Sequence, residues 1–110
     1  MALIKGFGLD LETTLDVIHG TTATNGQLKI NYATKVLTGD IEPGFAIDLA
    51  HKDLTLIIES ANKGNVPMPM AAAARESVSL ARAGGWGSKG FSGLADFWCE
   101  MAGVEKARFK

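Results

Sequence analysis

The sequence predicts an all-α fold, a single helical domain that spans residues 1–110. Valine and isoleucine recur at helical spacing, and no run alternates strictly between apolar and polar residues as a half-buried strand does. Glycines divide the chain into segments of the length that helices have in globular proteins. With 110 residues, the chain is long enough to bury a modest core.

Each expected helix is bounded by a glycine, a proline or a capping residue. Asp10 precedes the second helix as a cap, and Pro69 suits the first turn of the fifth. Gly39 ends the third helix, and Ser92 is expected to cap the last. The expected ranges are 1–6, 11–19, 25–37, 45–63, 69–83 and 93–102.

Further expectations concern the first segment, the third segment and the C-terminal tail. The first segment, 1–6, begins without a capping residue, so we expect it to be the end of a longer helix. In the third segment an inward stripe is expected from Leu28, Tyr32, Val36 and Leu37. The short basic tail, 104–110, is expected to be loose.

Composition narrows the classes of function. The net charge is −1, from 11 basic and 12 acidic residues, so no basic field is available to bind nucleic acid. The single Cys99 excludes an intrachain disulfide and a cysteine cluster, and no His, Asp or Glu residues have metal-ligand spacing. The apolar runs are too short to span a membrane. Without a disulfide or a secretory signal, a cytoplasmic location is expected.

Asp53 is the residue that fits its helix least well. On a helix its neighbours three and four residues away are all apolar, namely Leu49, Ala50, Leu56 and Ile57. A carboxylate on an apolar face costs free energy unless a hydrogen bond or a cation compensates it. Because such local inconsistencies tend to mark functional sites, Asp53 is the leading candidate.

Structural interpretations of the same region stay open. Lys52 is positioned to pair with Asp48 one helical turn earlier. Asp53 is placed to cap a neighbouring helix or to pair with Arg75. Phe45 is a natural core residue or hydrophobic staple at a helix start.

Other polar or glycine-rich features are expected to be structural. His51 falls on the polar face and is expected to be solvated, and His19 lies near a helix C-terminus, where a cation is mildly favoured. The loop 84–90 lacks the spacing of a phosphate-binding loop and is expected to be a simple connection. Trp86, Phe97 and Trp98 are expected to be packing anchors or dimer contacts.

The order of motifs resembles the C-terminal domain of the 3-hydroxyacid dehydrogenase family, whose members include 3-hydroxyisobutyrate dehydrogenase, tartronate semialdehyde reductase and sulfolactaldehyde reductase. A Pro-Gly-Phe turn at 43–45 is followed by Lys-Asp-Leu at 52–54. The segments 8–10 and 34–40 upstream and 66–69 downstream also fit, so the match covers nearly the whole chain.

The resemblance implies the helical half of a two-domain oxidoreductase, with a fold like the C-terminal domain of 6-phosphogluconate dehydrogenase. NAD or NADP would be bound mainly by a Rossmann domain, which is expected upstream because no Gly-x-Gly-x-x-Gly follows a strand here. The catalytic lysine is expected upstream of Met1 as well, so no catalytic residue is expected in this chain. By resemblance, Lys52 contacts the cofactor, Phe45 and Asp53 line the substrate pocket, and Asp53 has a supporting role.

Two functions follow. The first is an active-site-completing and dimerising domain of an NAD(P)-dependent enzyme acting on a small 3-hydroxy acid or its semialdehyde, inactive in isolation. The second is a helical oligomerisation or binding module without chemistry of its own. Loss of an interdomain helix should expose apolar surface, so a homo-oligomer is expected in either case.

Overall fold

The computed structural model describes residues 1–110, which form two compact units. The first comprises 1–42 and 92–110, and the second comprises 43–91. The all-α prediction is confirmed, since the only pairing of β type is an isolated antiparallel bridge between Ala46 and Gly90.

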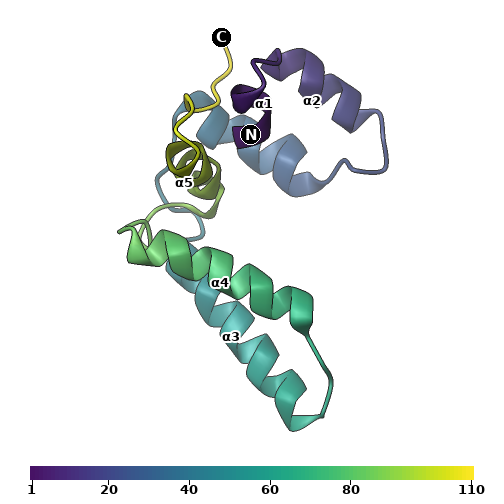
Figure 1. Ribbon diagram of the computed structural model, residues 1–110, viewed down its shortest axis with the longest axis vertical. Coiled ribbons are helices and arrows are strands. Elements are labelled where there is room, and N and C mark those ends of the chain that lie inside the picture. The colour runs from purple at the N-terminus through teal and green to yellow at the C-terminus, as the bar shows by residue number, and fades with distance from the viewer. The chain divides into compact units, whose positions relative to one another are not determined.

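The first unit is built from short helices around a small apolar core (Figure 1). Helices α1 (Ala2–Gly6), α2 (Leu11–His19) and α5 (Leu94–Met101) surround it together with two irregular helical turns. The predicted cap is confirmed, because the Asp10 carboxylate accepts a hydrogen bond from the Thr13 backbone N–H at 2.9 Å. That bond lowers the pKa of Asp10. The buried core residues are Ile4, Leu11, Leu15, Val36, Leu37, Ala95 and Ala107.

The third helical segment is irregular, where one helix over 25–37 was expected. It consists of a π-helix, η1 (Gln27–Tyr32), and a 3₁₀ turn, η2 (Val36–Thr38), separated at Lys35 by non-helical angles of φ −122° and ψ −95°. The inward stripe is nevertheless confirmed, since Val36 and Leu37 are fully buried and Leu28 and Tyr32 pack against the same core. Burial raises the pKa of the Tyr32 phenol. Gly39 ends the segment with φ 91°, as predicted.

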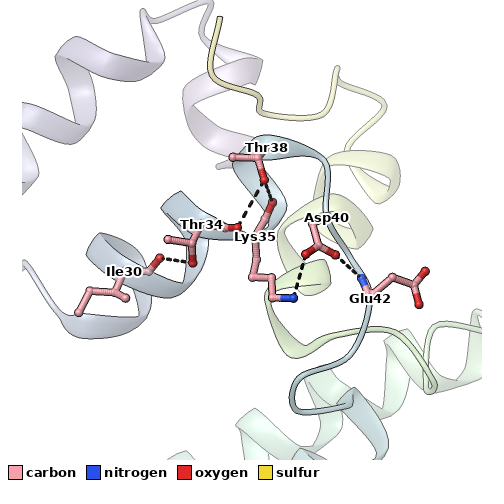
Figure 2. A network of polar contacts seen from close by, with 6 residues as sticks. All are labelled: Ile30, Thr34, Lys35, Thr38, Asp40 and Glu42. Carbon is pink, nitrogen blue, oxygen red and sulfur yellow. Dashed lines mark hydrogen bonds and ion pairs between the residues drawn. The ribbon is translucent and has the colours of Figure 1, made fainter.

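A polar network fixes the turn that follows this segment. Figure 2 shows the Lys35 ammonium directed at the Asp40 carboxylate, 2.8 Å away. The second oxygen of Asp40 accepts the Glu42 backbone N–H at 2.9 Å. The hydrogen bond from Lys35, followed by that from Glu42, lowers the pKa of Asp40. The threonine hydroxyls of the network bond to backbone carbonyls of the preceding turn, which explains how the chain tolerates its irregular helix.

Two predictions for the C-terminal region are wrong. Helix α5 begins after Gly93 and has no side-chain cap, because Ser92 lies buried in a separate 3₁₀ turn, η3 (Phe91–Gly93). The tail is not loose, because Ala107 is buried in the core and the Phe109 N–H donates to the Leu37 carbonyl at 2.9 Å. Arg108 holds the buried Asp96 carboxylate through two hydrogen bonds of 2.8 and 2.7 Å.

The second unit is a helical hairpin. Helices α3 (Ile47–Lys63) and α4 (Pro69–Ala83) lie side by side (Figure 1). Their turn contains Asn65 in the left-handed region, with φ 56°. Pro69 occupies the first turn of α4, as predicted, where its missing N–H has no carbonyl to meet.

Candidate functional site

The polar face of α3 packs against α4. The Asp48 carboxylate accepts a hydrogen bond from Arg82 Nε at 2.7 Å, and Arg82 Nη1 lies 3.2 Å from His51 Nδ1. His51 Nε2 in turn lies 3.1 Å from the Ser79 hydroxyl. The expected pairing of Lys52 with Asp48 and the expected solvation of His51 are therefore both wrong, because α4 supplies partners that the pattern of α3 alone does not reveal.

The His51–Ser79 contact resembles a base beside a nucleophile but has the wrong proton arrangement. An arginine can only donate, so His51 Nδ1 must be the acceptor and Nε2 must carry the proton. With that proton directed at the Ser79 oxygen, His51 cannot remove a proton from the hydroxyl. The cluster therefore links the two helices structurally and is not a hydrolytic site.

One apolar strip of α3 is exposed, while Ile47, Ala50 and Ile58 of the same helix are buried. Leu49, Leu56 and Ile57 have 44%, 53% and 48% of their surface accessible. Lys52 and Asp53 lie among them, and their ammonium and carboxylate groups are 3.3 Å apart. Both side chains are about half exposed, so the desolvation cost expected for Asp53 is not incurred. Asp53 forms its ion pair with Lys52, so the expected pairing of Asp53 with Arg75 is wrong.

Phe45 lies just before α3 and shares its surroundings with Phe91. The two rings meet edge to face, with centroids 6.1 Å apart and an interplanar angle of 68°. The Phe45 carbonyl also accepts the Phe91 N–H at 2.7 Å. With 43% of its surface accessible, Phe45 is not a core residue, and it leaves one side of its ring open to a ligand.

The glycine-rich loop 84–90 caps the start of α3. Helix α3 has Ala46 at its N-cap position and no side-chain cap. Instead, the Lys89 carbonyl accepts the Ile47 N–H and the Gly87 carbonyl accepts the Asp48 N–H, each at 2.9 Å. The loop is therefore more than the simple connection expected. Because it directs carbonyls at a helix, it does not form the ring of N–H donors that a phosphate needs. The absence of a capping side chain at Ala46 is the signal that sequence reasoning overlooked.

Lys52 and Asp53 thus lie side by side on the exposed surface of α3, and Phe45 lies two residues before the helix begins, against Phe91. The set combines a cation, a carboxylate, an aromatic edge and apolar neighbours. These groups fit one side of a dinucleotide, because an ammonium can bond a ribose or carboxamide oxygen and the apolar neighbours can border a nicotinamide ring. They do not make up a complete site, since loop 84–90 is not a phosphate cradle.

The fold and the site together define the class of this protein, which is an all-helical domain with a lysine–aspartate pair on an exposed helix surface. A family model described as 'NAD-binding of NADP-dependent 3-hydroxyisobutyrate dehydrogenase' matches residues 1–98. The chain belongs to this family. The recognised resemblance is thereby confirmed.

Individual relatives agree with the family. The chain is 42% identical to the 3-sulfolactaldehyde reductase of Escherichia coli over 94 residues, which cover 86% of this chain and 32% of the relative. It is 36% identical to the 2-(hydroxymethyl)glutarate dehydrogenase of Eubacterium barkeri over 105 residues, 94% of this chain and 35% of that enzyme. It therefore spans about a third of the length of these curated relatives.

Solved structures give the same result. A crystal structure of 3-hydroxyisobutyrate dehydrogenase from Salmonella typhimurium matches 87% of this chain and 33% of its own, with a TM-score of 0.77 and 27% identity. The relatives are dehydrogenases, so NAD-binding oxidoreductases form the class to which the chain is related. Separately, none of the helices combines the length and the apolar character needed to cross a membrane.

Proposed function

We propose that this chain is the helical, active-site-completing part of an NAD(P)-dependent dehydrogenase of a small 3-hydroxy acid or its semialdehyde. The observation that carries the proposal is the Lys52–Asp53 pair, half exposed on an apolar helix face within the family match. The names of the relatives favour the substrate class, since they act on sulfolactaldehyde, 2-(hydroxymethyl)glutarate and L-threonate.

Each residue of the face has a part in this proposal. When bound, the nicotinamide supplies the chemistry of hydride transfer. Lys52 donates hydrogen bonds to the cofactor as a mobile point charge. Asp53 holds the Lys52 ammonium toward the cleft and orients neighbouring donors. Phe45 excludes water from the substrate with the open side of its ring. The general acid/base lysine belongs to the part of the enzyme that we place upstream of Met1.

The exposed apolar side chains support a cleft that forms on assembly with a nucleotide-binding domain. Leu49, Leu56 and Ile57 are each about half exposed, so covering them would stabilise the assembly by roughly 2–4 kcal/mol. The same surface supports self-association, and a dimer belongs to the proposal. A cytoplasmic location also belongs to it, because the single Cys99 is a free, buried thiol.

The test compares Lys52→Gln with Lys63→Gln in the longer enzyme. Lys63 is an exposed lysine at the far end of the same helix, so it controls for the loss of charge. A charge-assisted hydrogen bond is worth about 1.5–3 kcal/mol, so the KM for the dinucleotide should rise roughly tenfold or more in Lys52→Gln. An unchanged KM, equal to that of Lys63→Gln, would refute the cofactor contact.

The alternative is a helical oligomerisation module without chemistry, which the exposed apolar face of α3 also favours. Calorimetry with NADH on the isolated chain and on the longer enzyme separates the two. Binding by the longer enzyme, with none by the isolated chain, supports the active-site-completing domain. Binding by neither, together with self-association of the chain in sedimentation, favours the module.

A further inference from the structure

We propose that Gly87 is a positioning residue, which lets loop 84–90 fix the first turn of α3 and thereby the orientation of Phe45 toward the substrate. The inference rests on the proposed function for the role of Phe45. The clamp, by which we mean the backbone hydrogen bonds between loop 84–90 and the first turn of α3, rests on geometry within the second unit alone.

Three backbone hydrogen bonds tie the loop and its exit to the start of α3. Phe91 N–H donates to the Phe45 carbonyl at 2.7 Å, Ile47 N–H to the Lys89 carbonyl at 2.9 Å, and Asp48 N–H to the Gly87 carbonyl at 2.9 Å. The bridge between Ala46 and Gly90 lies between them. This short antiparallel ladder supplies two of the acceptors that the first N–H groups of a helix otherwise lack.

Gly87 is required because the Asp48 side chain occupies the space where a Cβ would be. A Cβ built at position 87 would lie 2.8 Å from Asp48 Cγ, a distance that real Cβ atoms essentially never show. The Asp48 side chain is 53% exposed, so it can withdraw, but only by breaking the 2.7 Å hydrogen bond that its carboxylate accepts from Arg82 Nε. A side chain at 87 must therefore displace the Asp48 carboxylate from Arg82, the loop, or the first turn of α3.

Displacement of this turn acts directly on Phe45. The Phe45 ring rests edge to face on Phe91, and its carbonyl is held by the N–H of the same residue. If these backbone hydrogen bonds are lost, the rings of Phe45 and Phe91 are both free to rotate. On the proposed function, a displaced Phe45 ring contacts the bound substrate less well, so the loss should appear in the substrate KM.

The first experiment measures hydrogen exchange in the 110-residue chain, for Gly87→Ala, Asp48→Ala and the double variant. Gly64→Ala is the matched control, because it lies at the other end of α3 and its Cβ would meet nothing closer than 3.6 Å. Gly87→Ala should speed exchange of the Ile47 and Asp48 amides about tenfold or more, and Gly64→Ala should leave them unchanged. The double variant should restore the slow exchange, because Asp48→Ala removes the obstructing carboxylate. Unchanged exchange in Gly87→Ala, or no restoration in the double variant, would overturn the clamp.

The second experiment measures steady-state kinetics of the same variants in the longer enzyme. Gly87→Ala should raise the substrate KM about tenfold, and the double variant should recover it. A merely structural role would lower the active fraction and hence the apparent kcat, but would leave KM unchanged. An unchanged substrate KM alongside fast exchange would overturn the positioning role. If Lys52→Gln leaves the cofactor KM unaltered while the exchange pattern holds, it is the proposed function that fails and the clamp that stands.

Discussion

Removal of Arg108 should destabilise the chain more than any other single change at a charged residue. The guanidinium of Arg108 bonds both oxygens of Asp96, whose side chain is only 1% exposed. The hydrogen bond to Asp96 raises the pKa of Arg108, so the guanidinium stays charged at any ordinary pH. Arg108→Ala leaves a buried carboxylate without its cation, which costs about 3–5 kcal/mol. Because Arg108 is itself 32% exposed and water can partly replace it, we expect the lower end of that range.

Thermal unfolding of the 110-residue chain by circular dichroism measures this loss. A loss of about 3 kcal/mol should lower the Tm by roughly 12 °C or more for a domain of this size. Lys5→Ala is the control, since Lys5 pairs with a Glu105 side chain that is 89% exposed. That surface pair should contribute about 1 kcal/mol at most.

A double variant distinguishes the unpaired charge from simple loss of packing. Asp96→Leu combined with Arg108→Met removes both charges while keeping similar volumes. It should unfold at a higher temperature than Arg108→Ala, because no carboxylate is left buried without a partner. If Arg108→Ala unfolds within about 2 °C of Lys5→Ala, the reasoning is refuted and the tail contributes little to the fold.

Three further outcomes are expected. Folding lowers the pKa of Asp40 from 3.8, so its stabilising contribution is present above that value and is lost as the pH falls through the folded pKa. In urea unfolding, Asp40→Asn should therefore lose less unfolding free energy on acidification than the wild type does. Ile57→Gln should weaken self-association in sedimentation without lowering the Tm, because Ile57 is 48% exposed. A chain ending at residue 98, the limit of the family match, should lose cooperative unfolding, because it lacks the buried Ala107.

Local chemistry made some elements predictable. Helix α2 begins after Asp10 and ends at His19, as expected from a capping carboxylate and a following glycine. Helix α4 begins at Pro69 for an equally local reason. In both cases the signal lies within a few residues of the boundary, so no knowledge of the surrounding fold is needed.

Long-range partners account for the failures. The tail was expected to be loose because it is short and basic, yet Arg108 bonds a carboxylate twelve residues earlier on α5. The start of α3 lacks a capping side chain because loop 84–90, far along the chain, provides carbonyls instead. Sequence periodicity does not indicate which distant segment will supply an acceptor or a cation.

The site itself was predictable in its residues and not in its surroundings. Phe45, Lys52 and Asp53 were selected from one motif; the structure pairs Lys52 with Asp53 on α3 and places Phe45 just before the helix, against Phe91. Their roles in binding cofactor and substrate stay predictions. The prediction that Asp53 fits its helix poorly came from its four apolar neighbours, and the structure shows why it is tolerated: Asp53 is itself half exposed, as are Leu49, Leu56 and Ile57, while only Ala50 is buried.

The second, exposed apolar strip of α3, Leu49, Leu56 and Ile57, therefore carries the strongest argument about function. Within the hairpin, α3 already buries Ile47, Ala50 and Ile58, and Arg82 and Ser79 of α4 bond its polar residues Asp48 and His51. The half-exposed strip is therefore apolar surface that the hairpin leaves uncovered. On our proposal that strip meets a nucleotide-binding domain, and Asp53 experiences a low-dielectric environment only after assembly. Its interaction with Lys52 would then strengthen at the moment the cleft closes. Asp53→Asn should therefore weaken dinucleotide binding in the assembled enzyme by more free energy than it removes from the unfolding of the isolated chain. Equal losses of binding and unfolding free energy would contradict this account.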